Sequence, residues 1–342
     1  MIKFELSGKA YKANLHCHTT VSDGRYTPEE TKKMYMEQGY SIIAFTDHNV
    51  LLDHSDLCDE SFLALNGYEL DVTEPGKDFN FARTAHMCLI AKKQDNLTQV
   101  CYNKDKYVWG NARDYIPQLK YDRDDYERVY SHEGVSDMIK KGKDGGFFVT
   151  YNHPVWSIES YPEYSGYEGM DAMEIFNTGC DRGGWNEYNA RCYDDLLRQG
   201  KRIFCIAADD NHSSGCHSIG MPGFDCFGGW VMIFAEKFEY GSVMKALEDG
   251  KFYCVSSFGT SGPAIEEFYV EDGWVYVKTS PVKRICYMTK YRRAELQGAV
   301  GDEYITEAKF KINPDDGYFR LDIVDEFGSH ANTNAVFTDE IF

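Results

Sequence analysis

Histidine and carboxylate side chains recur along the chain where short apolar runs end. His16 and His18 flank Cys17, so in an extended segment both imidazoles project to one side and the thiol to the other. The same residue types return in FTDH, NGYEL, TAHM, YNHP and ADDNH. Imidazole and carboxylate together suit Zn, Mn or Fe, and the lack of cysteine ligands argues against a structural zinc. The nine candidate metal ligands are His16, His18, Asp23, His48, Glu69, His86, His153, Asp210 and His212.

A single histidine at a strand end is more often a satisfied polar residue than a ligand. Six histidines, each near a strand end and accompanied by carboxylates, are hard to explain in that way. A convergent cluster of this kind could not satisfy its polar atoms easily without a cation. The pattern therefore predicts a metal centre.

The segments that must position these residues alternate between apolar runs and helical patterns. Such alternation predicts an α/β fold with βα units around a parallel sheet, and seven strands favour a closed barrel. Active sites of βα barrels lie at the carboxyl ends of the strands, where most of the candidate ligands fall. The predicted strands are Ala13–His16, Ser41–Thr46, Phe62–Glu69, Thr84–Ala91, Gly146–Tyr151, Asp171–Phe176 and Arg202–Ala208, and the predicted helices are Thr27–Gln38, His132–Lys141 and Asn186–Gln199.

Two segments depart from this rhythm. Residues 94–128 are polar, rich in tyrosine and weakly periodic, which is typical of an insertion over one barrel end, where long inserts often act as lids. After residue 260, alternating runs separated by Gly, Pro and Asp predict antiparallel strands, including a hairpin about Asp272-Gly273. We therefore expect a barrel over residues 1–259 and a small C-terminal β-sandwich over residues 260–342.

The order of these motifs resembles the polymerase and histidinol phosphatase (PHP) family. HxH followed by SDG, then TDH, a strand-ending Glu, two separated His and a closing DxH span about Tyr11–His212. The stretches EIFNTG, DDLLRQGKRIFCIAADDNH and GGWVMIFAE further resemble one branch of that family, which includes carbamate and ester hydrolases with an appended β-domain. The resemblance implies a distorted seven-stranded βα barrel with a site for two to three divalent metal ions.

The resemblance also implies how the candidate ligands divide among the metals. His16, His18, Glu69 and Asp210 would hold one ion, Glu69 would bridge to a second ion held by His86 and His153, and Asp23, His48 and His212 would hold a third. The chain departs from the family pattern at Asp209, where a small residue usually precedes DxH. We assign Asp210 as the ligand and expect Asp209, like Asp47 beside His48, to support ligands instead.

A hydrolytic mechanism follows from such a centre. Metal coordination lowers the pKa of bound water from 15.7 to about 7, which provides a hydroxide nucleophile at neutral pH. No Ser or Cys nucleophile is needed, and neither GxSxG nor a P-loop occurs. The leading hypothesis is hydrolysis of a small phosphomonoester, including a nucleotide, by metal hydroxide at a trinuclear site. The alternative is a carboxylic ester, amide or carbamate hydrolase with the same centre, and a third is a non-enzymatic metal-dependent binding protein.

The residues that would bind the rest of the substrate carry a weaker signal. Arg182 and Arg83 could clamp a phosphate, and His217 could protonate a leaving group, although solvated loop residues would look the same. Tyr102, Tyr107, Trp109 and Tyr115 of the insertion could stack on a ring or merely pack. The remaining histidines, which fit no ligand pattern, are His54, His132 and His330.

Composition sets the outer limits of function. The chain has 342 residues, of which 43% are hydrophobic, and a formal charge of −19, which excludes disorder and a broad surface for nucleic-acid polymers or anionic membranes. The charge does not exclude a compact phosphorylated substrate if metal ions fill the site. Most of the 11 cysteines stand alone in apolar runs, which predicts free thiols. With no apolar leader in the sequence, we expect a cytoplasmic location.

Overall fold

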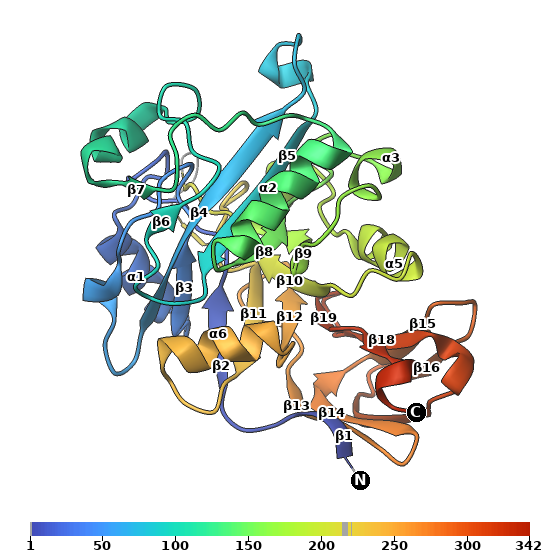
Figure 1. Cartoon of the computed structure of the whole chain (residues 1–342). Helices are drawn as coiled ribbons and strands as arrows, with labels where there is room; N and C mark the ends of the chain where they lie inside the picture. The colour runs from blue at the N-terminus through green and yellow to red at the C-terminus, as the bar shows by residue number, and fades with distance from the viewer. Residues whose placement is uncertain (1, 214–217, 220) are drawn as a thin grey trace.

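The computed structural model describes residues 2–213, 218–219 and 221–342, and a mixed sheet of fourteen strands runs through its centre (Figure 1). In spatial order this sheet contains β10 (Phe204–Ala208), β9 (Ala172–Asn177), β8 (Phe147–Tyr151), β5 (Thr84–Ala91), β4 (Leu63–Thr73), β3 (Ile42–Phe45), β2 (Ala10–Asn14), β11 (Gly229–Phe234), β12 (Phe252–Ser256), β19 (His330–Thr333), β18 (Tyr318–Val324), β15 (Arg284–Thr289) and β16 (Ala294–Gly298), with β20 (Val336–Phe337) beside β18.

Two smaller sheets and short helices complete the fold. The four-stranded sheet contains β1 (Ile2–Leu6), β13 (Ile265–Glu271), β14 (Trp274–Val282) and β17 (Ile305–Lys311), and the two-stranded sheet contains β6 (Thr98–Gln99) and β7 (Lys120–Tyr121). The α-helices are α1 (Pro28–Met36), α2 (His132–Asp144), α3 (Tyr161–Tyr164), α4 (Thr178–Arg182), α5 (Ala190–Arg198) and α6 (Tyr240–Glu248). The short 3-10 helices are η1 (Ser55–Leu57), η2 (Phe79–Phe81), η3 (Gly110–Gln118), η4 (Pro314–Asp316) and η5 (Thr338–Glu340).

The seven predicted strands and three predicted helices all form, but the sheet is not wholly parallel. Strand β5 runs antiparallel to both of its neighbours, β4 and β8. The connection from β4 to β5 is short, so the chain returns directly alongside itself instead of crossing over through a helix. His86 lies near the start of β5 and therefore reaches the edge where the neighbouring parallel strands end.

The segments that follow the first and last of these seven strands lie side by side. The Asp210 N–H donates to the His16 carbonyl at 2.9 Å, and the His18 N–H donates to the Asn211 carbonyl at 3.2 Å. An isolated parallel bridge between Cys17 and Asn211 joins the segments after β2 and β10, while the ladder from β2 continues into β11. The closed seven-stranded barrel stays a prediction, but the segments that follow its first and last strands, β2 and β10, are in contact.

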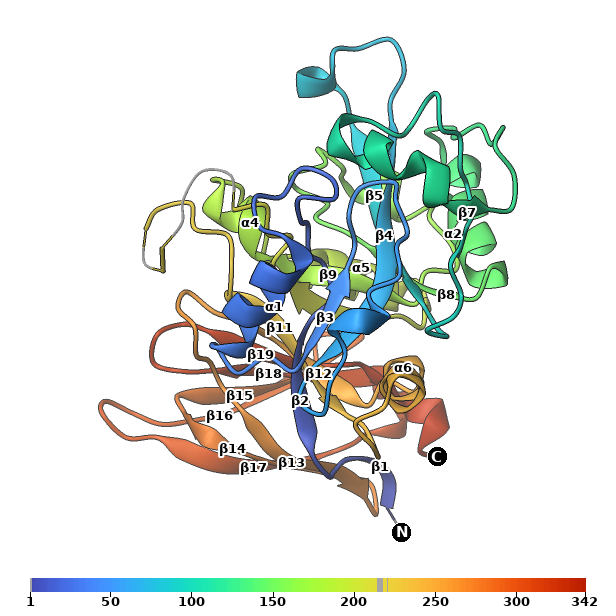
Figure 2. The ribbon, with the colours of Figure 1, turned by 90° about the vertical axis from the view of Figure 1, so that its left-hand side faces the viewer.

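The C-terminal strands belong to two sheets (Figure 2). The hairpin about Asp272-Gly273 forms, and both turn residues have positive φ, as a type I′ turn requires. Strand β13 pairs with the N-terminal β1, and β14 and β17 follow it in the same sheet, whereas β15, β16 and β18 extend the central sheet through the β12–β19 ladder. This continuous pairing ties residues 260–342 to the rest of the chain, and a separate C-terminal domain stays a prediction.

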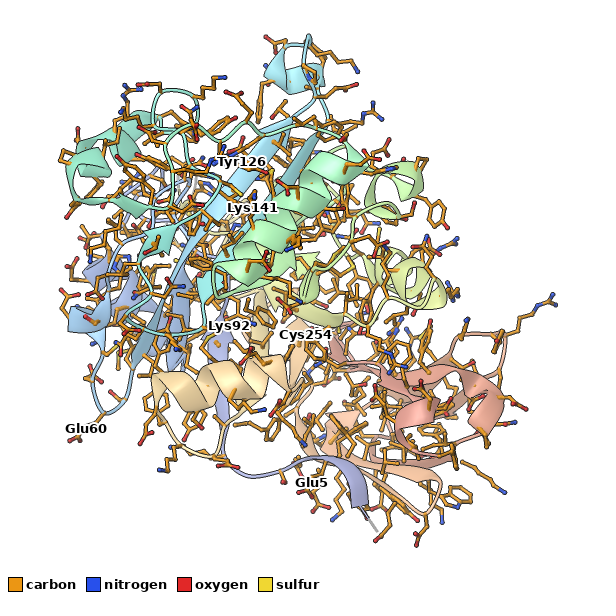
Figure 3. All side chains as sticks on the ribbon, in the orientation of Figure 1. Glu5, Glu60, Lys92, Tyr126, Lys141 and Cys254 are labelled. Atoms are coloured by element: carbon orange, nitrogen blue, oxygen red, sulfur yellow. The ribbon has the colours of Figure 1, made fainter. Side chains whose placement is uncertain are left out.

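The 94–128 insertion packs over the loops that follow β2 and β3. Its Tyr102, Val108 and Leu119 form a minor apolar core with Val21 and Val50 of those loops. Gln99 donates from Nε2 to the Asn49 carbonyl at 2.7 Å and accepts from the Leu51 N–H at 3.1 Å. On its other side, Tyr126 donates to Asp137 of α2 at 2.6 Å, beside Lys141 (Figure 3).

The ten described cysteines are all free, as predicted, and most are buried. Cys205 and Cys254, for example, lie in the core with their sulfurs 3.7 Å apart. Among the described helices, none combines the length and apolar character needed to cross a membrane.

Candidate metal centre

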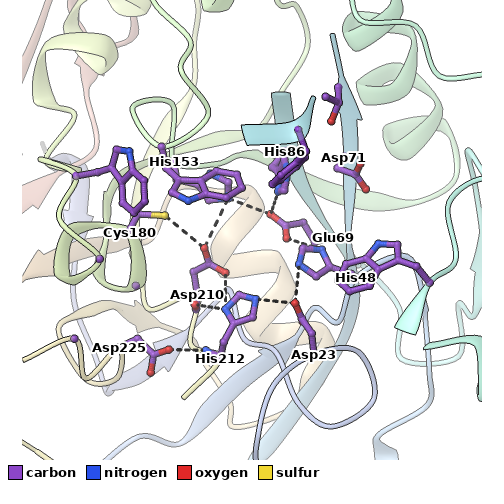
Figure 4. A pocket seen from close by; sticks show the side chains of 18 residues that line it. Asp23, His48, Glu69, Asp71, His86, His153, Cys180, Asp210, His212 and Asp225 are labelled. Atoms are coloured by element: carbon purple, nitrogen blue, oxygen red, sulfur yellow. Dashed lines mark hydrogen bonds and ion pairs between the residues drawn. The ribbon is translucent and has the colours of Figure 1, made fainter. Parts of the chain in front are cut away.

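The nine candidate ligands converge on one place in the fold, and Figure 4 labels all of them except His16 and His18. They come from the loops after β2, β3, β8 and β10 and from β4 and β5. Within each set of potential donors, one atom per residue lies within 4.8 Å of the others. The four sets are His18, Asp23, His48 and His212; His16, His18, Glu69 and Asp210; His16, His153 and Glu174; and Glu69, His86 and His153.

Glu69, in the middle of β4, occupies the centre of the cluster. Its Oε1 lies 3.2 Å from His16 Nε2 and from His86 Nδ1, and 3.3 Å from His153 Nε2. Its Oε2 lies 3.1 Å from His48 Nδ1 and 3.4 Å from His18 Nε2. One buried carboxylate therefore faces five imidazoles, the arrangement expected of a group shared between ions.

Two buried polar atoms in the cluster lack a hydrogen-bond partner among the described residues. These atoms are His18 Nδ1 and Asp210 Oδ1. His16 Nε2 and His18 Nε2 face each other at 3.1 Å, and both lie within 3.1 Å of Asp210 Oδ1. Buried polar atoms are normally paired, so this crowding of unsatisfied donors fits divalent cations between them.

Backbone strain accompanies the site. His153, Asp210 and Ser213 adopt positive φ values of 26°, 51° and 55°, a region that side chains other than glycine rarely enter. Asn49, next to His48, has a φ of 61°. Strained residues of this kind gather at functional sites when the surrounding structure holds them in place.

The charges of the cluster are strongly coupled. Burial raises the pKa of Glu69 and of Asp210, but nearby imidazoles, His16 first among them, bring both pKa values well below their usual range. Burial and the neighbouring His18 lower the pKa of His48 to about 3. The carboxylates thus stay ionised and His48 stays neutral at physiological pH, the states in which both types bind metals.

Buried carboxylates behind the ligands hold the loops that carry them. Glu174 of β9 accepts from His16 Nδ1 at 2.7 Å and from the His153 N–H at 3.0 Å. A carboxylate partner of this kind fixes the orientation of a ligand imidazole and raises its basicity. Sequence reasoning missed Glu174, although a lone charged residue inside the apolar strand AMEIFN was a usable signal.

The same device recurs in three further loops. Asp47 accepts from the N–H groups of Thr19 and Ser22, so it fixes the turn before Asp23 instead of contacting an imidazole as predicted. Asp225 accepts from the backbone N–H groups of residues 212 and 213 at 2.8 and 2.7 Å. Asp209 accepts from the N–H groups of residues 227–229 and from two hydroxyls, so it supports the fold beside the ligand Asp210 as expected.

A cavity of about 680 Å³ opens above the cluster. Besides the ligands, its wall contains four aromatic side chains and two further carboxylates, Asp71 and Asp225. No Lys or Arg lines it among the residues that the structure describes. The aromatic residues of the wall are Phe79, Trp109, Trp156 and Trp185.

The predicted phosphate-binding arginines do not line this cavity. Arg83 forms ion pairs with Glu74 and Glu163. Arg182 donates to the Phe224 carbonyl at 2.9 Å from Nη1, and its buried Nη2 has no hydrogen-bond partner among the described residues. The Arg83 guanidinium is taken up by carboxylates, and that of Arg182 is held in part by a backbone carbonyl. His217 lies outside the described residues.

Of the four aromatic residues predicted in the insertion, only Trp109 reaches the cavity. Tyr102 is buried and stacks on Tyr121, and the Tyr107 ring lies 3.9 Å from the Arg128 guanidinium. Tyr115 packs against the minor apolar core of the insertion. The remaining histidines take other partners, as expected: His54 packs on Phe45, His132 bonds the Pro162 carbonyl and His330 pairs with Asp322.

The fold and the site define a class of protein. It is that of α/β proteins whose clustered imidazoles and carboxylates, near the ends of the central strands, can hold divalent metal ions. Residues 14–150 match the model of the PHP domain family. This match includes six of the nine candidate ligands and ends before His153, Asp210 and His212. None of the curated proteins compared with the chain matches it.

Three solved structures show a distant likeness. A two-domain protein of Bacteroides vulgatus containing a predicted PHP-like metal-dependent phosphoesterase has 16% identity and a TM-score of 0.46, covering 96% of this chain and 95% of that one. A candidate metal-dependent phosphoesterase of Bifidobacterium adolescentis has 16% identity and a TM-score of 0.36, covering 62% and 92%. An amidohydrolase of Chromobacterium violaceum with bound sulfate and no metal has 12% identity and a TM-score of 0.36, covering 59% and 88%. At these distances the assignment rests on the family match and the site.

Proposed function

We propose that the protein is a metal-dependent hydrolase that cleaves small phosphomonoesters at a centre of two or three divalent ions, zinc, manganese or iron. The observation that carries this proposal is Glu69 facing five imidazoles on the floor of a cavity of about 680 Å³. His16, His18, Glu69 and Asp210 would hold one ion, Glu69, His86 and His153 a second, and Asp23, His48 and His212 a third. The finer form of the fold, a seven-stranded barrel closed through residues 16–18 and 210–211, belongs to the same proposal.

Bound divalent ions would supply an acidified water and would neutralise charge on the phosphoryl oxygens. In the hydrolysis, the oxygen of water bonds to phosphorus while the ester P–O bond breaks. One proton of water leaves with the alcohol and the other stays on phosphate. Glu174 keeps the His16 imidazole oriented, and Asp225 keeps the His212 loop in place. The aromatic wall limits the access of bulk water to the reacting groups.

A carboxylic ester, amide or carbamate hydrolase is the second candidate. The lack of Lys or Arg in the described part of the cavity wall favours it, because a neutral carbonyl substrate needs no cationic side chain. A phosphate would depend on the ions alone for its counter-charge.

Paired substrates separate the two candidates. The full chain, stripped of metal and reloaded with Mn or Zn, is assayed on p-nitrophenyl phosphate, p-nitrophenyl acetate and a panel of phosphomonoesters. We expect metal-dependent phosphate release that His16→Ala abolishes. Background rates on every phosphate, with metal-dependent cleavage of the acetate, would replace the phosphoesterase by the second candidate.

A further inference from the structure

Four aromatic side chains from four separate segments meet around the cavity above the candidate ligands. Phe79 comes from η2, Trp109 from the insertion, Trp156 from the loop after β8 and Trp185 from the connection between α4 and α5. Phe79, Trp109 and Trp185 are 57%, 46% and 42% exposed. Single exposed aromatic residues are ordinary, but several around one cavity mark a binding surface.

The aromatic wall begins at the ligand imidazoles. The Trp156 ring meets His86 and His153 edge-on, with centroids 5.3 and 5.1 Å apart. The Trp109 ring tilts over His48 at 5.4 Å. A group attached to a phosphoryl or acyl centre at the ligands would therefore contact these rings next.

Hydrogen bonds hold the segments that carry Trp156 and Trp109. Glu187 is fully buried and accepts from the N–H groups of Val155 and Trp156 at 3.0 and 2.8 Å. Asn111, two residues after Trp109, donates to the Thr20 carbonyl at 3.3 Å. A preformed aromatic surface costs little entropy on binding, so it can select for shape.

The charge of the wall limits what can accompany the ring. Asp71, whose side chain is 31% exposed, adds a carboxylate to the wall. Its partner Arg128 is 1% exposed and directs its other N–H groups to the Cys101 carbonyl, behind the wall. An anionic group on the far side of the substrate would face carboxylates without a cationic side chain among the described lining residues.

We infer that the leaving group of the substrate is uncharged and presents a flat aromatic ring to Trp109, Trp156, Trp185 and Phe79. This inference rests on the proposed function, because it assumes that the reacting centre binds at the candidate ligands. Sugar phosphates and substrates with a second anionic group are therefore poor substrates, whereas ring-bearing monoesters are preferred.

Non-hydrolysable phosphonates test this preference without requiring turnover. Benzylphosphonate, ethylphosphonate and 4-carboxybenzylphosphonate are titrated calorimetrically into the metal-loaded full chain. We expect benzylphosphonate to bind about tenfold more tightly than ethylphosphonate, which corresponds to about 1.4 kcal/mol and lies within the range of a stacked ring. The added carboxylate should remove most of that gain. Equal affinities for the benzyl and ethyl compounds would overturn the inference.

Variants assign the preference to the wall. Trp185→Leu, whose ring makes no described contact with a ligand imidazole, should lower the benzyl-to-ethyl affinity ratio about threefold to tenfold. Tyr291→Leu, which removes a 62% exposed ring away from the cavity, should keep the wild-type ratio. An unchanged ratio in Trp185→Leu and in Trp109→Leu would contradict the assignment. The proposed function fails separately, if benzyl and ethyl phosphates both show no metal-dependent phosphate release.

Discussion

Glu174→Gln should weaken metal binding without removing any of the nine candidate ligands. The carboxylate accepts from buried His16 Nδ1 at 2.7 Å, so the imidazole directs Nε2 toward Glu69 and Asp210. Glutamine keeps the volume and a carbonyl oxygen but removes the charge that makes His16 a better donor. Loss of such a partner typically costs about 10-fold to 100-fold in metal affinity, or about 1.4–2.7 kcal/mol.

Calorimetric titration of Zn and of Mn into the metal-stripped protein measures this effect. The matched control is Glu159→Gln, because Glu159 is also buried but accepts hydrogen bonds from Tyr130, Tyr151 and Tyr167 instead of from a candidate ligand. We expect a weaker affinity with unchanged stoichiometry in Glu174→Gln, and wild-type binding in the control. A fall of one ion in stoichiometry would make Glu174 a ligand itself, and an affinity within twofold of wild type would refute the reasoning.

Three further predictions concern stability. Saturating Mn or Zn should raise the Tm of the wild type by several degrees, since a ligand at about 100 times its Kd stabilises by about 2.7 kcal/mol. Thermal scans with and without EDTA measure this shift, and His16→Ala should show no such shift. Arg320→Met leaves Asp194 without its 2.8 Å partner in the core and should lower the free energy of unfolding in urea by about 3–5 kcal/mol. The Arg320→Met/Asp194→Leu double variant should recover this stability, and a double variant whose loss is the sum of the two single losses would contradict the prediction. Burial raises the pKa of Glu159 above 4.5, so the protonated side chain contributes its full stability below that pH, and this contribution is lost as the pH rises through the pKa of the folded state. Unfolding measured from about pH 4 to about pH 8 should show this loss of stability in the wild type but not in Glu159→Gln.

The clustering of the candidate ligands could be predicted from the sequence because most of them follow apolar runs within a few residues. His48 and His153 follow β3 and β8, whose residues are all buried, and strands buried on both faces read as continuous apolar segments. The strand ends therefore fixed the side of the sheet on which the ligands meet. His86 reached the same place for a different reason, because β5 runs antiparallel, and sequence periodicity does not reveal strand direction.

The supporting and substrate-facing residues could not be read in the same way. Asp225 and Glu187 accept hydrogen bonds from backbone N–H groups that lie more than ten residues away in the sequence. No local spacing in the sequence therefore indicates their role. Arg83 and Arg182 looked suitable as phosphate ligands because a sequence does not show that Arg83 pairs with Glu74 or that Arg182 donates to a backbone carbonyl. The sheet pairing of the C-terminal strands could not be predicted either, because β13 pairs with β1, which lies at the opposite end of the chain.

The charge of −19 takes on a specific meaning at this site. The ligands Asp23, Glu69 and Asp210 contribute three negative charges, while Glu174 and Asp225 behind them bring more carboxylate toward the same point. Without cations, this cavity would repel any phosphate, since its described wall offers no Lys or Arg in compensation. Two or three divalent ions would add four to six positive charges, which exceeds the three negative charges of Asp23, Glu69 and Asp210. Loading of the ions must therefore precede binding of an anionic substrate. The same carboxylates that attract the ions would repel the substrate until the ions are bound.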